Sequence, residues 1–140
     1  MLCKSHCDVF EAGSHASTFG GNPFVCAVAL AVCQTLEKEN LLANVQLRGE
    51  DLRTGLKAIA AKYPNLFREV RGWGLINGME LNSDVELTSI DIVKAAMNEG
   101  LLIVPAGPKV LRFVPPLIIT ETEVMEAMDA LARAIANVVK

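Results

Sequence analysis

The chain has 140 residues, enough for one hydrophobic core but not for two, and its 51% of hydrophobic residues suggest surfaces that another domain or subunit covers. A net charge of −3 gives no electrostatic reason to expect nucleic acid or an anionic membrane as a partner. Because no apolar run reaches the roughly 20 residues that cross a bilayer and no signal sequence opens the chain, we expect a cytoplasmic protein.

The sequence pattern of residues 1–63 predicts an arm followed by two helices. Residues 1–22 show no sustained hydrophobic period and are expected to form an arm with loop character. Asn22-Pro23 is a strong helix start, and the first helix, about 23–39, is apolar on nearly every side, which predicts burial on every side. A second helix is predicted over about 43–63. Its apolar stripe comprises Val45, Leu52, Leu56, Ile59 and Tyr63, with Gly49 in register.

The second part of the chain alternates strands and helices. The expected elements are strands over about 67–71 and 75–81, a helix over 89–99, strands over 101–104 and 110–114, and a helix from about 120 onward. Both helices open with a capping box, Thr88 with Asp91 and Thr120 with Glu123. The stripe of the last helix comprises Val124, Met128, Leu131, Ile135 and Val138.

The order α-α-β-β-α-β-β-α predicts an α+β fold in which helices cover one face of a small, mostly antiparallel sheet. We therefore divide the chain into an arm, residues 1–22, and a small α+β domain, residues 23–140. No internal repeat or low-complexity linker interrupts either part.

Residues 13–23, Gly-Ser-His-Ala-Ser-Thr-Phe-Gly-Gly-Asn-Pro, are the most informative segment of the chain. Two adjacent hydroxyls, Ser17 and Thr18, and two adjacent glycines precede the helix start. Free backbone N–H groups and the positive end of the helix dipole lie close to them, an arrangement that suits a phosphate or a carboxylate. The spacing by itself is not specific, because a capped helix behind a flexible loop is common.

Three ordered motifs resemble one family. Residues 15–23 are similar to the His-x-Ser-Thr-Phe-Gly-Gly-Asn-Pro signature of class III (ornithine-type) pyridoxal-phosphate aminotransferases. Residues 70–81, Val-Arg-Gly-Trp-Gly-Leu-Ile-Asn-Gly-Met-Glu-Leu, and 110–117, Val-Leu-Arg-Phe-Val-Pro-Pro-Leu, fit the same family in the same order. The resemblance covers essentially the whole chain. It implies the small C-terminal domain of a fold-type I homodimer that binds pyridoxal 5'-phosphate.

The resemblance also implies a role for Thr18. In the family the threonine at this position bonds the cofactor phosphate across the dimer, so Thr18 would serve the active site of the neighbouring subunit. Ser17 is the next candidate for the phosphate, through its backbone or its hydroxyl. The alternative for both hydroxyls is that they cap a local turn.

Arg112 is a charged residue in an otherwise apolar strand. On strand alternation it shares a face with Val110 and Val114, opposite Leu111 and Phe113. A guanidinium offers a flat fork that matches a carboxylate. From spacing alone, the alternative is a solvent-facing arginine on an edge strand. The family motif places an arginine here at the substrate pocket, where it meets a substrate carboxylate or is held by a glutamate outside this chain.

We assign no catalytic residue to this chain. A transaminase needs a lysine that forms a Schiff base with the cofactor and an acid that faces the pyridinium nitrogen. The resemblance implies that both come before residue 1. None of the seven lysines has the family's lysine context, and Lys4, the nearest to the signature, lies in Cys-Lys-Ser-His. We therefore expect the C-terminal part of an aminotransferase that is inactive alone.

Other notable residues receive structural interpretations. Arg71 and Trp73 lie among Gly72, Gly74 and Gly78, which fit a tight hairpin and close packing.

A metal site is the other hypothesis that the sequence raises. Cys3, His6 and Cys7 could ligate zinc, but the only other histidine is His15, and no second cysteine pair follows at ligand spacing. We expect no metal, and we interpret His15 as a motif residue without a chemical role.

The resemblance implies the reaction as well. The opening segment favours N2-acetylornithine as the amino donor and 2-oxoglutarate as the acceptor, in arginine biosynthesis. Ornithine, succinylornithine and 4-aminobutyrate remain alternative donors, because the family members that use them share these motifs. The expected partners are the large cofactor-binding domain and a second subunit. A different possibility is a non-catalytic module for ligand sensing or dimerisation.

Overall fold

A computed structural model describes residues 4–11, 13–14 and 16–139. It separates the chain into two compact units, an N-terminal unit (Met1–Glu39) and a C-terminal unit (Asn40–Lys140). The boundary after residue 22 that the sequence suggests stays a prediction.

The N-terminal unit contains a short 3₁₀ helix, η1 (Ser5–Cys7), and the helix α1 (Pro23–Lys38). The predicted start of α1 is confirmed: Asn22 Oδ1 accepts the N–H of Val25 at 2.9 Å, and proline occupies the first helical position. The predicted burial of α1 is wrong for this chain, because none of its residues is buried. A helix is buried only where another element supplies a matching surface, and the described residues of this unit supply one short 3₁₀ helix and loops besides α1.

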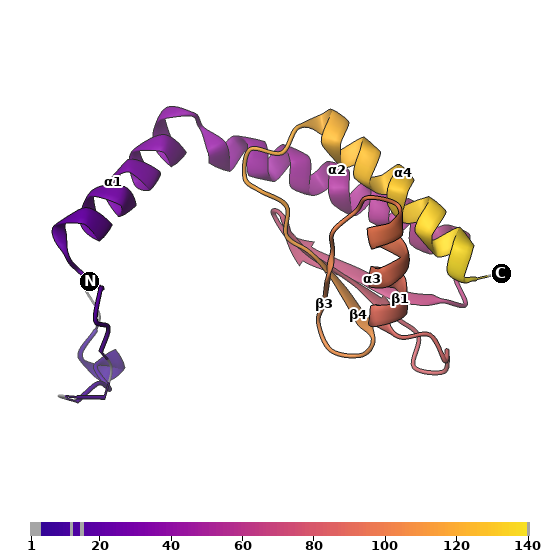
Figure 1. The fold of residues 1–140 in the computed structure, drawn as a ribbon, viewed down its shortest axis with the longest axis horizontal. Helices are drawn as coiled ribbons and strands as arrows, with labels where there is room; N and C mark the ends of the chain where they lie inside the picture. Colours follow the sequence, from indigo (N-terminus) through magenta and orange to yellow (C-terminus); the bar gives the residue numbers. More distant parts are fainter. Residues whose placement is uncertain (1–3, 12, 15, 140) are drawn as a thin grey trace. The chain divides into compact units, whose positions relative to one another are not determined.

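The C-terminal unit has the predicted α+β fold (Figure 1). Its elements are α2 (Leu41–Lys62), β1 (Phe67–Trp73), β2 (Ile76–Leu81), α3 (Ser89–Asn98), β3 (Val104–Pro105), β4 (Val110–Phe113) and α4 (Glu121–Val138). The four strands form one sheet in the order β1-β2-β4-β3, and every neighbouring pair is antiparallel. The mostly antiparallel sheet expected from the sequence is thereby confirmed.

Two strands, β1 and β3, differ from the prediction by more than one residue. β1 continues to Trp73, because the hairpin turns at Gly74 and Leu75 rather than at the first glycine. β3 is only two residues long, since the N–H of Leu101 bonds the carbonyl of Ala96 and closes the turn after α3. The residues between that turn and Val104 run as a connection instead of a strand.

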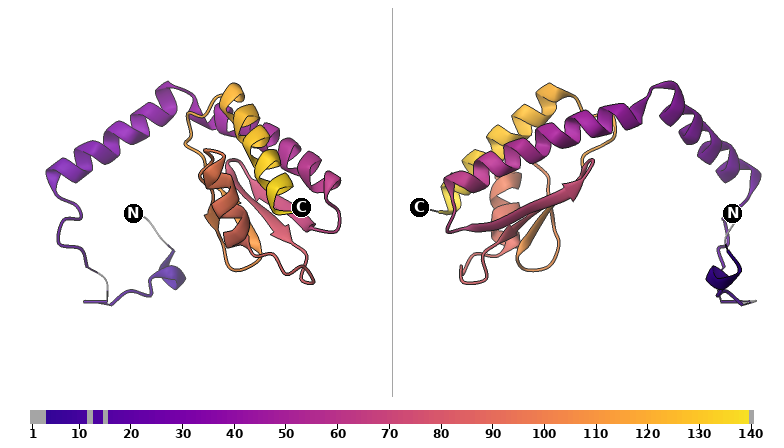
Figure 2. Two further views of the ribbon diagram at one scale, coloured as in Figure 1. Left: turned by 45° about the vertical axis from the view of Figure 1, so that its right-hand side comes forward. Right: turned by 180° about the vertical axis from the view of Figure 1, so that it is seen from behind.

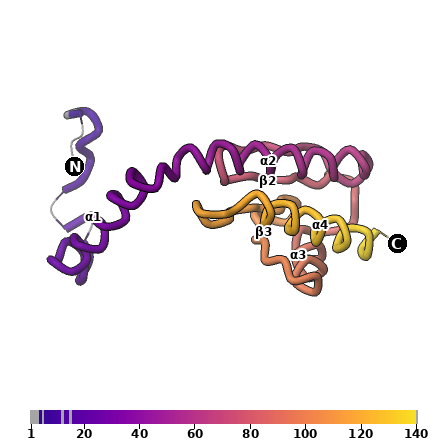
Figure 3. The backbone as a smooth tube through the Cα atoms, turned by 90° about the horizontal axis from the view of Figure 1, so that it is seen from above, coloured from indigo at the N-terminus to yellow at the C-terminus, as the bar shows by residue number. Residues whose placement is uncertain are grey.

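Three helices cover one face of the sheet (Figures 1 and 2). α2 packs on β1 and β2, α3 packs on β3 and β4, and α4 runs alongside α2 and also contacts α3 (Figure 3). The core lies between these helices and the inner sheet face. Its fully buried side chains include Leu56, Met79, Leu81, Ile92, Leu111, Leu131 and Ile135. The outer sheet face carries no helix of this unit.

Both predicted capping boxes are present. Asp91 accepts the backbone N–H of Thr88 at 2.8 Å, and Glu123 accepts that of Thr120 at 2.8 Å. These bonds satisfy N–H groups that would otherwise lack partners at the helix starts.

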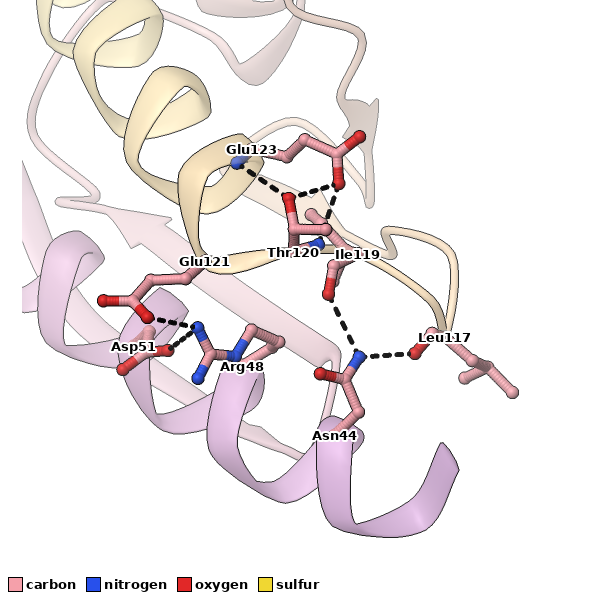
Figure 4. A network of polar contacts seen from close by, with 8 residues as sticks. All are labelled: Asn44, Arg48, Asp51, Leu117, Ile119, Thr120, Glu121 and Glu123. Atoms are coloured by element: carbon pink, nitrogen blue, oxygen red, sulfur yellow. Dashed lines mark hydrogen bonds and ion pairs between the residues drawn. The ribbon is translucent and has the colours of Figure 1, made fainter. Parts of the chain in front are cut away.

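A polar network ties the segment between β4 and α4 to α2 (Figure 4). The side-chain amide of Asn44 donates to the carbonyls of Leu117 at 2.8 Å and Ile119 at 3.0 Å. One turn further along α2, Arg48 pairs with Glu121 at 3.2 Å. The chain that leaves β4 is therefore held at three points, Leu117, Ile119 and Glu121, in the ten residues after Arg112.

Glycines allow the close approach of α2 to the β1–β2 hairpin. A Cβ at Gly49 would stand 2.3 Å from the carbonyl oxygen of Gly74, and Gly74 itself has a φ of +52°. A Cβ at Gly72 would stand 2.3 Å from the carbonyl oxygen of Ile76. The structural interpretation of Gly72 and Gly74 is confirmed.

Candidate functional site

The signature segment of the N-terminal unit is a turn closed by its own hydrogen bonds. Ser17 Oγ accepts the N–H of Gly20 at 3.0 Å, and the side-chain amide of Asn22 donates to the carbonyl of Phe19 at 2.7 Å. Gly21 adopts a φ of +76°, a conformation that glycine favours. The Ser17 hydroxyl is thus a turn cap, as one of the two interpretations expects, and it keeps its own O–H to donate elsewhere.

Thr18 differs from its neighbour. It is exposed, and within the described part of the chain its hydroxyl has no hydrogen-bond partner. It lies a few residues before α1, whose first turn contains no acidic residue. A free hydroxyl a few residues before a helix start without acidic residues is chemically suited to a phosphate, because hydroxyl groups and helix N-termini both interact favourably with negative oxygens. His15 of the same motif lies outside the described residues.

Arg112 lies on the outer face of the sheet. Leu111 is fully buried and Phe113 is 5% exposed, whereas Arg112 between them is exposed, so the predicted alternation is confirmed. The alternative, a solvent-facing arginine on an edge strand, is wrong about the strand, because β4 is an inner strand with β2 on one side and β3 on the other, but the side chain does face solvent in this chain. In the register of the sheet, Arg112 pairs with Gly78 and with Val104.

Arg112 differs from the other arginines in its lack of a carboxylate partner. The paired arginines are Arg48 with Asp51 and Glu121, Arg53 with Glu50, Arg68 with Glu80, Arg71 with Glu69 and Glu80, and Arg133 with Glu99. Among the residues that the structure describes, Arg112 has neither an ion pair nor a hydrogen-bond partner for its guanidinium. Its charge is therefore available to an external anion.

Arg71 provides the contrast on the same face. It pairs with Glu69 at 3.0 Å and makes a closer contact with Glu80. The hydrogen bond from the Arg71 side chain is the largest cause that lowers the pKa of Glu80, and the bond to Glu80 in turn raises the pKa of Arg71. The charge of Arg71 is thus compensated within the sheet, whereas that of Arg112 is not.

Two hollows border Arg112. One lies on the outer sheet face between Arg71 and Arg112 and is lined also by Ile76, Gly78 and Val110. The other is mainly apolar. Its lining includes Leu102, Val104, Val114, Pro115 and Met128 together with Arg112. The arrangement offers one uncompensated cation with apolar surface beside it, which suits a carboxylate at the end of a short aliphatic chain.

Sequence reasoning identified Arg112 but not the neighbours that define its surroundings. Strand alternation could place Arg112 on a face. It could not show that Gly78 lies directly opposite, because that pairing joins residues 34 positions apart. Thr18 and Arg112 belong to different units of the chain.

Two further findings concern the described residues. No group of three or more His, Cys, Asp or Glu side chains in this part of the chain could hold a metal ion, and Cys3 of the metal hypothesis lies outside it. None of the described helices combines the length and the apolar character needed to traverse a bilayer.

Comparisons with known proteins agree with the motifs. Residues 3–135 match the family described as aminotransferase class-III. The acetylornithine aminotransferase of a Nostoc species is 69% identical over 138 residues, which cover 99% of this chain and 32% of that protein. The corresponding protein of a Synechocystis species is 63% identical, with 99% and 32% covered. The chain thus spans about a third of the length of these relatives.

Solved structures show the same relationship. The ornithine aminotransferase of Toxoplasma gondii superposes with a TM-score of 0.80 at 36% identity, over 94% of this chain and 31% of that one. The N-acetylornithine aminotransferase of Stenotrophomonas maltophilia gives 0.78 at 41% identity, over 86% and 33%. Family match, sequence identity and fold agree, and the chain belongs to the class-III aminotransferases.

Proposed function

We propose that this chain is the C-terminal part of an acetylornithine aminotransferase, which transfers the amino group of N2-acetylornithine to 2-oxoglutarate in arginine biosynthesis. The observation that carries the proposal is the uncompensated guanidinium of Arg112 on the outer sheet face. Its support is the naming of relatives at 69%, 63% and 62% identity as acetylornithine aminotransferases.

Arg112 binds a substrate carboxylate in this proposal. N2-acetylornithine carries one carboxylate and 2-oxoglutarate carries two, so a single arginine can serve both half-reactions. The planar guanidinium can donate two parallel N–H bonds to a carboxylate, and this fixes the orientation of the substrate as well as its position. The Asn44 and Arg48 contacts to the segment after β4 help to hold the strand that carries Arg112.

Thr18 and Ser17 bind the phosphate of pyridoxal 5'-phosphate, on which class-III aminotransferases depend. Thr18 offers its free hydroxyl, and Ser17 offers the O–H that its turn leaves unused. In the proposed homodimer both residues serve the active site of the neighbouring subunit. When bound, the cofactor supplies the carbonyl group and the electron sink that amino-group transfer needs.

The chain by itself is inactive in this proposal, because the Schiff-base lysine and the acid that faces the pyridinium nitrogen belong to the large cofactor-binding domain. The chain contributes the small domain, one carboxylate-binding arginine and the phosphate contact to a partner subunit. The enzyme is cytoplasmic, and its ligands are small amino acids and 2-oxo acids rather than nucleic acid or membrane.

Substitution of Arg112 in the full-length enzyme tests the substrate role. We expect Arg112→Ala to raise KM for 2-oxoglutarate and for N2-acetylornithine by about 10- to 100-fold, since a charge-assisted bond is lost. Arg133→Ala, which removes an exposed arginine paired with Glu99, is the matched control and should leave KM unchanged. An unchanged KM in Arg112→Ala would contradict the proposal.

Thr18→Ala tests the phosphate role in the same enzyme. We expect the Kd for pyridoxal 5'-phosphate, measured by its absorbance on titration into apoenzyme, to rise about tenfold. Ser14→Ala is the control from the same arm, because among the described residues the Ser14 hydroxyl bonds only the nearby backbone of Glu11. Equal Kd values for wild type and Thr18→Ala would show that Thr18 does not bind the cofactor phosphate.

The amino donor needs its own test, because the solved ornithine aminotransferase of Toxoplasma gondii superposes as well as the acetylornithine enzymes do. We expect kcat/KM to be highest for N2-acetylornithine among four donors, the others being ornithine, succinylornithine and 4-aminobutyrate. A higher kcat/KM for ornithine would show that ornithine is the amino donor, and the enzyme would still be an aminotransferase.

An aminotransferase assay of the 140-residue chain tests whether it is inactive by itself. We expect no amino transfer when it is mixed with pyridoxal 5'-phosphate and substrates, and no specific lysine labelling after borohydride reduction. Labelling of one lysine would show that the chain holds its own Schiff-base residue. A stable oligomer that binds an amino acid without the cofactor would instead favour the sensing or dimerisation module.

A further inference from the structure

We propose that Gly78 is a specificity-determining residue, whose missing side chain keeps the sheet face beside Arg112 open to the carboxylate of a substrate. The inference rests on the proposed function, because it extends the role given there to Arg112. It concerns the hollow on the outer face of the sheet, which Gly78 lines together with Arg71 and Arg112.

The fold does not require glycine at position 78. A Cβ built there meets Val110 Cγ1 at 3.5 Å and two carbonyl oxygens at 4.0 Å, which are ordinary contacts, and its backbone is not left-handed. Gly72 on the neighbouring strand is different, since a Cβ there would stand 2.3 Å from a carbonyl oxygen. The interpretation that close packing explains Gly78 is therefore wrong within this chain.

Glycine inside a strand also has a thermodynamic cost. It weakens the strand, because it loses more backbone entropy than other residues and has no side chain to pack. Glycine inside a strand often marks a bulge or a place where a ligand or another backbone approaches closely, and the pairings of β2 show no register shift at Gly78. Gly78 lies in the middle of β2, an inner strand of the sheet.

The register places Gly78 between the two guanidinium-bearing side chains. It pairs with Arg71 across β1 and with Arg112 across β4. Side chains at directly opposite positions have Cβ atoms about 4.5 to 5.5 Å apart. A side chain at position 78 would therefore project from the same sheet face as Arg71 and Arg112, in the row between them, with Val110 as its nearest side-chain neighbour.

Charge and open space coincide at this position. On the far side of the hollow, Arg71 is held by Glu69 and Glu80, so its charge is already compensated. Arg112 has no carboxylate partner in the described chain. A carboxylate that enters above Gly78 reaches Arg112 directly, with the apolar side chains of Ile76 and Val110 beside it. The hollow thus suits a short aliphatic carboxylate.

Gly78→Ala and Gly78→Val in the full-length enzyme test the inference. The probes are glutarate, a dicarboxylate without a transferable group, for equilibrium binding by calorimetry, and 2-oxoglutarate for kinetics. We expect KM for 2-oxoglutarate and Kd for glutarate to rise several-fold in Gly78→Ala and about tenfold or more in Gly78→Val. The kcat at saturation and the Tm should stay close to those of wild type.

Gly72→Ala is the contrasting variant. Because a Cβ at Gly72 collides with backbone, we expect its Tm to fall clearly below wild type. If Gly78→Val does not fold, Gly78→Ala decides the matter by the same measurements. A Gly78→Ala variant whose Tm drops as far as that of Gly72→Ala shows a packing role for Gly78 and overturns the inference.

The same experiments separate this inference from the proposed function. If Arg112→Ala raises KM but Gly78→Val leaves KM and the glutarate Kd within about twofold of wild type, only the inference about Gly78 fails. If Arg112→Ala itself leaves KM unchanged, the proposed substrate role of Arg112 fails first. A rise in both variants with an unchanged Tm supports both.

Discussion

α1 and α4 are helices of similar length, 16 and 18 residues, but they differ in burial. α4 buries five residues, Val124, Ala130, Leu131, Ala134 and Ile135, whereas α1 buries none. Both begin at a polar cap, so the difference does not lie in how the helices start. It lies in the surface that their own unit supplies: α4 packs on α2 and α3, whereas the described residues of the N-terminal unit contain no second long helix or strand against which α1 could pack. Apolar content favours burial, but only a matching surface provides it.

Hydrogen exchange of the 140-residue chain should show the largest difference between the two helices. We expect amides of α4 to exchange only through global opening, and those of α1 to exchange through local opening with a free energy near zero. The two opening free energies then differ by the free energy of global unfolding, on the order of 5 kcal/mol. Equal protection of α1 and α4 would show that α1 is packed after all.

Truncation of one leucine in each helix compares the contribution of α1 and α4 to stability. Leu131 in α4 is fully buried and Leu30 in α1 is 58% exposed. We expect Leu131→Ala to lower the free energy of unfolding by about 3 kcal/mol, through lost burial and a residual cavity. Leu30→Ala should change it by less than about 0.5 kcal/mol. Urea denaturation followed by circular dichroism measures both, and comparable losses would contradict the distinction.

The two N-caps should differ by a smaller amount. Thr120→Ala removes the capping box of α4, which belongs to the C-terminal core, and we expect a loss of about 1 kcal/mol in the unfolding free energy. Asn22→Ala removes the cap of α1 and should leave the unfolding of the C-terminal unit unchanged. The same denaturation experiment distinguishes them, and a loss of stability in Asn22→Ala would show that the two units unfold together.

Acidification should produce the smallest effect, again within the C-terminal unit. The pKa of Glu123 is lowered, first by the backbone N–H of Thr120 and then by its hydroxyl. A carboxyl whose pKa is lower in the folded state stabilises the fold fully above its unfolded pKa, and this contribution is lost as pH falls through the folded pKa. We expect the urea concentration at the midpoint of unfolding to decrease as the pH is lowered below about 4.

Glu123→Gln should flatten that decline, because the glutamine cannot take up the proton and can still accept from Thr120. Glu126→Gln, on the same helix but outside the capping box, is the matched control. If both variants follow the wild-type pH profile, the capping carboxylate does not carry the effect.

Much of the fold could be predicted because its signals are local. The helix starts at Pro23 and Glu121 follow from caps within a few residues, and the face of Arg112 follows from strand alternation. The end of β1 and the short β3 could not be predicted, because they depend on hydrogen bonds that only the assembled turns and sheet reveal. The phosphate roles of Thr18 and Ser17 stay predictions.

The sequence alone determined the order of elements, the caps and the three motifs that indicate the family. Each of these is written within a short stretch of chain, where neighbouring residues set the backbone conformation. Only the tertiary structure decided which arginine is free. Arg71 is compensated by Glu80 of β2 and Arg112 faces Gly78 of that same strand, because antiparallel pairing brings these distant residues into register. Ion pairs and open space on a sheet arise from pairing across strands, and strand pairing depends on the whole fold.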